Sequence, residues 1–344
     1  MSLRGMLLTY RMHRFEVLFS AALLALFAAW VWMVSTQMLD LDIPGTCWPR
    51  TIDGDWAQPG CDDLMQTFWG IQGGAGYPRI GLALLAPIVG LLLGVPIVAR
   101  EIEMRTTELA WSLSLRRSRW LIARLLPMLM LALVGFIILG WLGSRLFTAM
   151  EVGRASPDLT EVASQGPALV ARGLMALGIG LLVGAIVGRT LPGLVLGAVV
   201  VLAWSVVAVP MVQRSMFEER AVWTNQNDSG WREGAGPIAY VNSGMFDPSK
   251  PGVDGEPGAR LDQELDMTPM VEAACGLEPT SYESPEGDAY QECSQRYWNS
   301  LQWDRSVPAS AYPHFQTVEA VLGLLIGGAA ILLAFPVVAR RRPS

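Results

Sequence analysis

The segment between residues 100 and 124 is dense in charged and hydroxyl side chains, which recognise other proteins through hydrogen bonds and charge. It carries six arginines, at positions 100, 105, 116, 117, 119 and 124, among acidic and Thr residues in an ordered pattern. A loop that only joined two membrane spans would need basic residues on its cytoplasmic side, but it would not need that order. We expect Glu101, Glu103, Thr107 and Glu108 to dock a cytoplasmic partner. The alternative is a short surface helix that only fixes topology.

The chain lacks the residues that would hydrolyse ATP through a Walker A loop. That loop requires Gly-x-x-x-x-Gly-Lys followed by Ser or Thr. The single lysine, Lys250, is followed by Pro251. His13 and His314 are too few to indicate a metal site, and His314 has no acidic partner in sequence. We expect no catalytic, cofactor or metal site on this chain. If ATP powers the protein, ATP and Mg²⁺ bind a separate ATPase.

The four cysteines lie in the two longest polar segments, two in each, and none lies in an apolar run. Cysteines that are grouped in pairs outside the membrane indicate disulfides in an oxidising compartment. The simplest pairing joins Cys47 to Cys61 and Cys275 to Cys293. Bridges from one loop to the other are the alternative.

The composition indicates an all-α polytopic membrane protein. Only 16% of the residues are charged, against about 25% in a typical soluble domain. A helix needs about 20 apolar residues to cross a bilayer. Six stretches qualify, at Val17–Met38, Ile80–Ala99, Leu121–Leu142, Pro167–Val187, Leu191–Val212 and Gln316–Val338.

The placement of basic residues predicts a cell-membrane protein with both termini in the cytoplasm. Basic residues are dense in the N-terminal segment, the 100–124 loop, the turn at Arg189 and the C-terminal tail. The same orientation places all four cysteines outside, where disulfides form. No basic tract indicates binding to nucleic acid.

The predicted organisation has five parts. Residues 1–15 form an interfacial helix on the inner leaflet, or only a basic segment that fixes topology. Residues 16–213 hold five spans, with an outer loop at 39–79 and a cytoplasmic loop at 100–120. Residues 214–315 form an outer region with 17 Asp and Glu against 7 Lys and Arg, in which strands and helices are not assignable. Residues 316–338 form the sixth span, and residues 339–344 form a tail.

Ionisable side chains are scarce in the predicted spans. Glu16 and Glu319 lie near span ends, and Arg172 lies about a turn and a half inside the fourth span. We expect Arg172 to snorkel to the outer surface, with a position facing a central pathway as the alternative. A proton-coupled carrier normally has acidic or His residues within its bundle, so this composition disfavours one. Glycines in the fourth and fifth spans permit close helix approach, inside the bundle or between subunits.

The 100–124 segment resembles the loop between the second and third spans of ABC-2 type transporter permeases. Members typically show an acidic residue, a small or Thr position, a Leu-x-x-Ser stretch, and then Ser, Arg and Trp. Here these are Glu101 and Glu103, Thr106 and Thr107, Leu109–Ser112, Ser114–Arg119 and Trp120. Leu115 stands where members have Pro. In the family this loop is the coupling helix that docks on the ATPase.

A second resemblance is a tight basic turn between the fourth and fifth spans, made here by Gly188, Arg189, Thr190 and Pro192. The layout of six spans with a large outer segment before the last is also similar. The resemblance implies a permease subunit that exports a hydrophobic or amphipathic substrate, with an ATPase and a second permease copy or homologue as partners. The alternative is a membrane sensor or assembly scaffold that binds a ligand through its acidic outer region.

Overall fold

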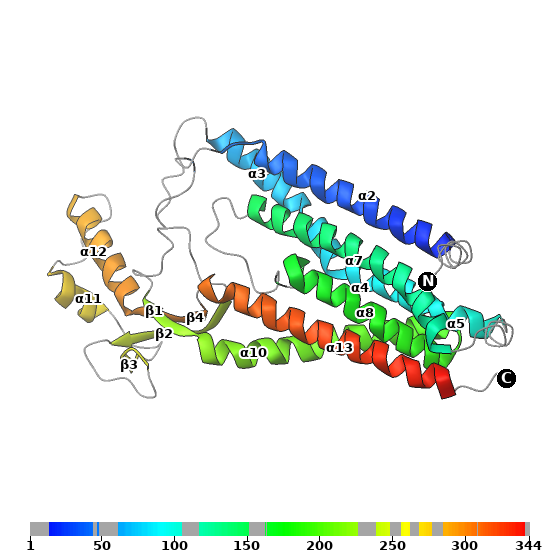
Figure 1. Ribbon diagram of the computed structural model, residues 1–344. Coiled ribbons are helices and arrows are strands. Elements are labelled where there is room, and N and C mark those ends of the chain that lie inside the picture. Colours follow the sequence, from blue (N-terminus) through cyan, green and yellow to red (C-terminus); the bar gives the residue numbers. More distant parts are fainter. Residues whose placement is uncertain are drawn as a thin grey trace. The chain divides into compact units, whose positions relative to one another are not determined.

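A computed structural model of the protein describes residues 14–43, 47, 61–104, 117–150, 162, 164–225, 239–247, 256–261, 268–276, 285–307 and 309–340. The chain divides into two compact units. Unit 1 comprises residues 1–153, 160–213 and 313–344, and unit 2 comprises residues 154–159 and 214–312. The described part of unit 1 is helical, whereas unit 2 also contains a β-sheet (Figure 1).

Long apolar helices build unit 1. The described ones are α2 (Arg14–Leu39), α3 (Asp62–Gly74), α4 (Gly76–Gly94), α5 (Pro96–Glu103), α7 (Arg117–Met150), α8 (Gly166–Val187), α9 (Thr190–Ala203) and α13 (Tyr312–Arg340). A π-helix, Trp204–Ala208, joins α9 to α10 (Val209–Arg220), which continues into unit 2. Among the described residues, six helical segments are long and apolar enough to cross a bilayer. Their number confirms the six spans predicted from hydropathy.

The helices are longer than their apolar runs. The chain is nearly continuously helical from Asp62 to Glu103, because the junction residues Ala75 and Val95 also have helical backbone angles. Within the predicted outer loop 39–79, residues Asp62–Gly74 form the helix α3. Hydropathy marks only the membrane-embedded portion of a helix. Acidic residues in the first turn, such as Asp62 and Asp63, favour a helix start in water.

The predicted tight turn between the fourth and fifth spans is confirmed. Helix α8 ends at Val187, and its C-cap Gly188 has a left-handed backbone with φ of 68°. Glycine adopts this conformation without steric cost. Arg189 is extended, and α9 starts at Thr190. The turn brings α9 back against α8.

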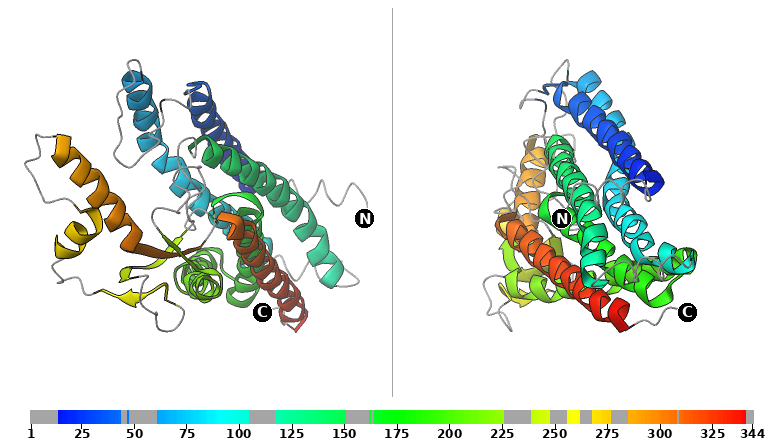
Figure 2. Two further views of the ribbon diagram at one scale, coloured as in Figure 1. Left: turned by 90° about the vertical axis from the view of Figure 1, so that its left-hand side faces the viewer. Right: turned by 45° about the vertical axis from the view of Figure 1, so that its right-hand side comes forward.

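Helix α8 lies at the centre of unit 1, packed against α4, α7 and α9. Its glycines allow backbones to meet: a Cβ at Gly184 would lie 2.5 Å from the Val95 carbonyl oxygen, and one at Gly178 would overlap Gly327 of α13. In lipid, small residues allow the close packing that holds helices together. The glycines of α8 therefore serve contacts inside this bundle. The long helices run side by side in Figure 2.

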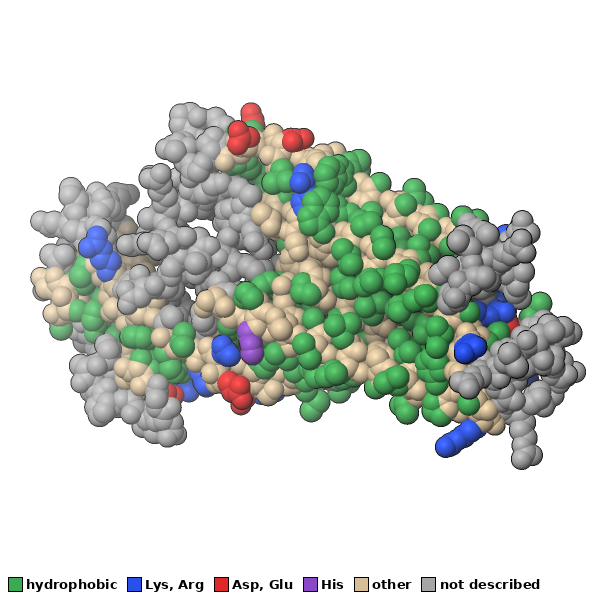
Figure 3. Space-filling model, viewed as in Figure 1, with side chains coloured by type: hydrophobic (Ala, Val, Ile, Leu, Met, Phe, Trp, Pro, Cys, Tyr) green, Lys and Arg blue, Asp and Glu red, His purple; other side chains and the backbone are tan. Residues whose placement is uncertain are grey.

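The remaining helix faces of unit 1 are apolar and exposed. In α9 these side chains include Leu191, Val195 and Val199, which are 74%, 62% and 57% exposed. Figure 3 shows apolar side chains over much of the visible face of the helices. A face of this kind suits hydrocarbon rather than water.

Unit 2 contains a four-stranded antiparallel sheet in the order β1-β4-β2-β3. Its strands are β1 (Val222–Asn225), β2 (Ala239–Asp247), β3 (Ala259–Arg260) and β4 (Gln302–Val307). The fully buried Phe246 packs edge-on against Trp223 at 5.0 Å between ring centroids. The expected all-α class therefore holds for the described residues of unit 1 and is wrong for unit 2.

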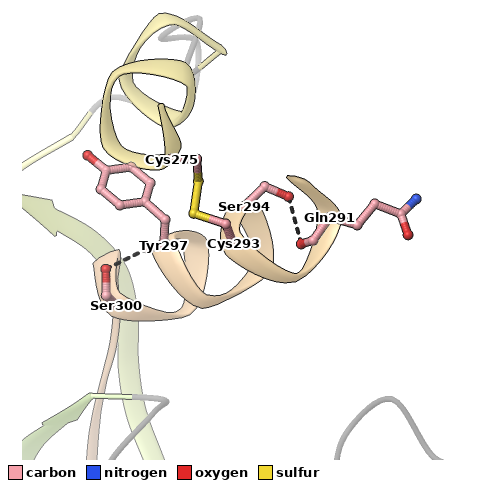
Figure 4. The surroundings of a disulfide bond; sticks show 6 residues. All are labelled: Cys275, Gln291, Cys293, Ser294, Tyr297 and Ser300. Atoms are coloured by element: carbon pink, nitrogen blue, oxygen red, sulfur yellow. Dashed lines mark hydrogen bonds between the residues drawn. A yellow bond between two sulfur atoms is a disulfide. The ribbon is translucent and has the colours of Figure 1, made fainter. Parts of the chain in front are cut away.

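Two helices complete the described part of unit 2. They are α11 (Thr268–Cys275) and α12 (Pro285–Leu301), and α12 runs directly into β4. A disulfide joins Cys275 at the end of α11 to Cys293 in α12, with the Cα atoms 5.8 Å apart (Figure 4). In unit 1, Cys47 is bonded to Cys61. The simplest cysteine pairing is thus confirmed.

The predicted interfacial helix at 1–15 lies almost entirely outside the described residues.

Candidate functional site

The short helix α5 ends the second span and is tied to three other helices through polar side chains. Arg100 donates a hydrogen bond to Glu16 of α2, and Glu101 accepts one from Arg124 of α7. Glu103 accepts a hydrogen bond of 3.0 Å from the backbone N–H of Thr190, the first residue of α9. Three of the four residues from 100 to 103 therefore contact three other helices. The N-terminal end of α2, α5 and the C-terminal end of α13 lie at one end of unit 1 (Figure 1).

Glu101 is buried, with 3% of its surface exposed. Its carboxylate pairs with Arg124, whose guanidinium also lies 4.9 Å from the centre of the Trp120 ring. The docking role expected of Glu101 stays a prediction. A carboxylate this deep needs a cation beside it. The arginine on the neighbouring helix supplies that cation.

Glu103 remains at the surface, beyond the apolar run that ends at Ala99. The backbone N–H of Thr190 holds the pKa of its carboxyl below the ordinary value, and the Thr190 side chain and Arg189 act in the same direction. A carboxylate at this position also stabilises the positive N-terminal end of α9. Thr107 and Glu108 lie outside the described residues, so their predicted docking role stays a prediction.

A second ion pair lies within the spans. Arg172 of α8 donates to Glu319 of α13, and both residues are buried, at 9% and 8% exposure. The prediction that Arg172 snorkels is therefore wrong. Each residue lies a few positions inside the start of its predicted span, at Pro167 and Gln316. Similar depth and opposite charge were a signal for pairing that the sequence did contain, because ionisable groups inside membranes pair with one another.

A groove lies between α7, α8 and α13, close to this pair. It has a volume of about 450 Å³ and an almost wholly apolar lining. Ala171 and Ala320, which line it, are the sequence neighbours of Arg172 and Glu319. The sequence analysis did not predict this groove, because it arises where three helices from distant parts of the chain meet.

Residues 21–214 match the model of the family described as ABC-2 membrane transporter related. The chain belongs to this family. The match covers more than half of the chain and includes the 100–124 segment and the turn at Gly188. No curated protein and no solved structure matches the chain. Membership in this permease family, together with six apolar helical segments, identifies a multi-pass membrane protein of the transporter permease class.

Proposed function

We propose that the chain is the membrane subunit of an ATP-binding cassette exporter and that separate ATPase chains dock on the loop between the second and third spans, residues 100–120. The observation that carries this proposal is the set of contacts made by α5. Arg100, Glu101 and Glu103 join the base of that loop to α2, α7 and α9. A partner that moves the loop thereby moves three helices.

The contacts of α5 support a positioning role for two of the four predicted docking residues, Glu101 and Glu103. Glu101 and Glu103 hold the base of the loop, while Thr107 and Glu108 face the ATPase. ATP binding changes the conformation of the ATPase. The permease responds only if the docked ATPase binds the two conformations of the permease with different affinities. The buried Glu101–Arg124 pair makes the base stiff enough to transmit that difference.

The substrate class follows from the apolar faces of unit 1. Apart from the Arg172–Glu319 pair, the described middle sections of the spans carry few ionised groups, which favours a hydrophobic or amphipathic molecule. Two copies, or this chain and a homologue, enclose the transport path. The end of unit 1 that holds α5 faces the cytoplasm.

Photocrosslinking in intact cells tests the docking site. A photoreactive phenylalanine at Glu108 is expected to capture a protein with a Walker A motif, identified by mass spectrometry. The same residue at Tyr77, which is 74% exposed in the first turn of α4, is the matched control and captures none. If position 108 captures no ATPase and the purified protein binds none, docking at this loop is excluded. A sensor or scaffold acting through unit 2 then becomes the better account.

A further inference from the structure

The groove between α7, α8 and α13 is open along one side of unit 1. Its rim is formed by Ile137 and Trp141 of α7 and Leu324 of α13, with exposed fractions of 52%, 56% and 49%. Its floor includes Val170 and Ala171 of α8. In a membrane, half-exposed apolar side chains around an apolar hollow contact hydrocarbon chains. The groove has room for part of one such chain.

A stripe on α7 continues from this groove toward a cation. Ile137, Trp141 and Arg145 follow one another at intervals of four residues, so they share one face of the helix. The Arg145 guanidinium carbon lies 4.5 Å from the centre of the Trp32 ring, and Trp32 stacks on Trp141 at 5.9 Å. The stripe changes from aliphatic to aromatic to cationic along α7.

Arg145 has donor capacity left over. Its Nε is buried without a hydrogen-bond partner, and among the described residues it forms no ion pair. An aromatic ring face stabilises a guanidinium that stacks on it. The N–H groups of the guanidinium point outward in its own plane, so the ring does not use them. A planar guanidinium with unused donors is well suited to a phosphate group.

The depth of the stripe fits the layers of a bilayer. The third apolar run starts at Leu121, and an α-helix rises about 1.5 Å per residue, so Trp141 lies about 30 Å further along. That distance is the thickness of the hydrocarbon core, and tryptophan favours the boundary. Arg145 lies one turn beyond, about 6 Å further, at the depth of lipid headgroups.

The deep end of the groove has no net charge. Arg172 and Glu319, next to the lining residues Ala171 and Ala320, neutralise each other. Arg145 therefore provides the net positive charge of this stripe. An uncharged interior with a cation at headgroup depth complements a molecule with an apolar chain and an anionic head.

We propose that this groove binds one phospholipid, with an acyl chain along Ile137 and Trp141 and the phosphate at Arg145. The assignment deepens the proposed function by naming the class of molecule that the permease handles, and its role in transport rests on that function. Binding itself does not require the ATPase. Failure of lipid binding is therefore distinguishable from failure of docking.

Native mass spectrometry of the full-length protein in detergent tests the proposal. The probes are phosphatidylglycerol with two oleoyl chains and dioleoylglycerol, which lacks the phosphate. The wild type is expected to retain the phosphatidylglycerol in preference to the dioleoylglycerol. Arg145→Gln weakens that retention about tenfold, the effect of one lost charge-assisted hydrogen bond. Arg79→Gln is the matched control, because the Arg79 guanidinium stacks on Phe147, on another face of α7, and it leaves retention unchanged.

A second pair of variants tests the apolar part of the groove. Leu324→Trp fills the groove and lowers retention of the phosphatidylglycerol. Leu325→Trp changes the adjacent residue, which is 64% exposed and not among the lining residues, and retention is unchanged. Equal retention of both lipids by the wild type, or equal effects of the two Trp variants, would overturn the proposal. Loss of a dimer rather than of lipid in Leu324→Trp would also overturn it and would assign the groove to a subunit interface.

Discussion

Each of the two units contains a disulfide, but the other contacts that stabilise each unit internally are different. In unit 1 the helices meet through glycines and through ion pairs such as Glu101–Arg124 and Arg172–Glu319. In unit 2, which also has a short antiparallel sheet, a disulfide joins the two helices α11 and α12. Lipid gives apolar helices no hydrophobic reason to associate, so close contact and charge must hold them. A small unit in water has that hydrophobic gain but too little core, and a covalent bond compensates.

The largest effect is expected from breaking a buried ion pair in unit 1. Glu101→Ala leaves Arg124 buried without its partner, which costs about 3–5 kcal/mol. The apparent melting temperature in detergent is therefore expected to fall sharply. Glu101→Ala combined with Arg124→Ala restores part of the loss, because no unpaired charge remains. Glu103→Ala, two residues away and exposed, is the control, and equal melting of the two single variants would show that the buried pair does not stabilise unit 1.

The disulfide of unit 2 is expected to give the next largest effect. Replacing both Cys275 and Cys293 by Ser opens a loop with a sequence separation of 18. The loop-entropy relation assigns such a bridge about 3 kcal/mol. Limited proteolysis is expected to cut within 268–301 in this variant and to spare the same region in the wild type. Replacing Cys47 and Cys61 by Ser is the control, because it removes a disulfide of unit 1 instead. Cleavage of unit 2 in that variant is expected to match the wild type.

The sequence predicted the parts of this molecule that depend on local composition. The six spans follow from runs of about 20 apolar residues, and the Gly188 turn follows from a glycine next to Arg189 and Pro192. The pairing of the cysteines was also predicted, from their closeness in sequence. These features need no knowledge of which helices are neighbours.

The partners of the charged residues could not be predicted in the same way. The pairing of Glu101 with Arg124 depends on how α5 packs against α7, and that packing is a tertiary property. The sheet of unit 2 was also missed. Two of its described strands are short, since β3 has two residues and β1 has four. The register of β2 on β4 is irregular between Tyr240 and Asn242, and this irregularity breaks the alternating pattern of a strand.

Adjacent glycines of α13 test helix packing in unit 1 directly. A Cβ at Gly327 would lie 2.8 Å from the Met175 Cα of α8, whereas a Cβ at Gly328 would meet nothing within 4 Å. Gly327→Ala is expected to destabilise unit 1 by about 1–3 kcal/mol through overpacking. Gly328→Ala is expected to be neutral or slightly stabilising, since alanine favours the helix. Melting temperatures of the two variants in detergent measure the difference, and a larger loss from Gly328→Ala would contradict the assignment of Gly327 to the α8 contact.

The smallest expected effect concerns Glu103, which links α5 to α9 at the surface. Its folded pKa lies below the ordinary value of 4.5, so its carboxylate stabilises the folded state above that pH. The contribution falls as the pH drops through the folded pKa, because the protonated acid is a weaker acceptor for the Thr190 N–H. The melting temperature of the wild type is expected to exceed that of Glu103→Gln at about pH 7, and the gap is expected to narrow toward about pH 4. Asp63→Asn controls for the loss of an exposed acid. A gap that widened in acid would show that the ionised carboxylate does not hold α9, and the link from the docking loop to α9 would then have to run through other residues.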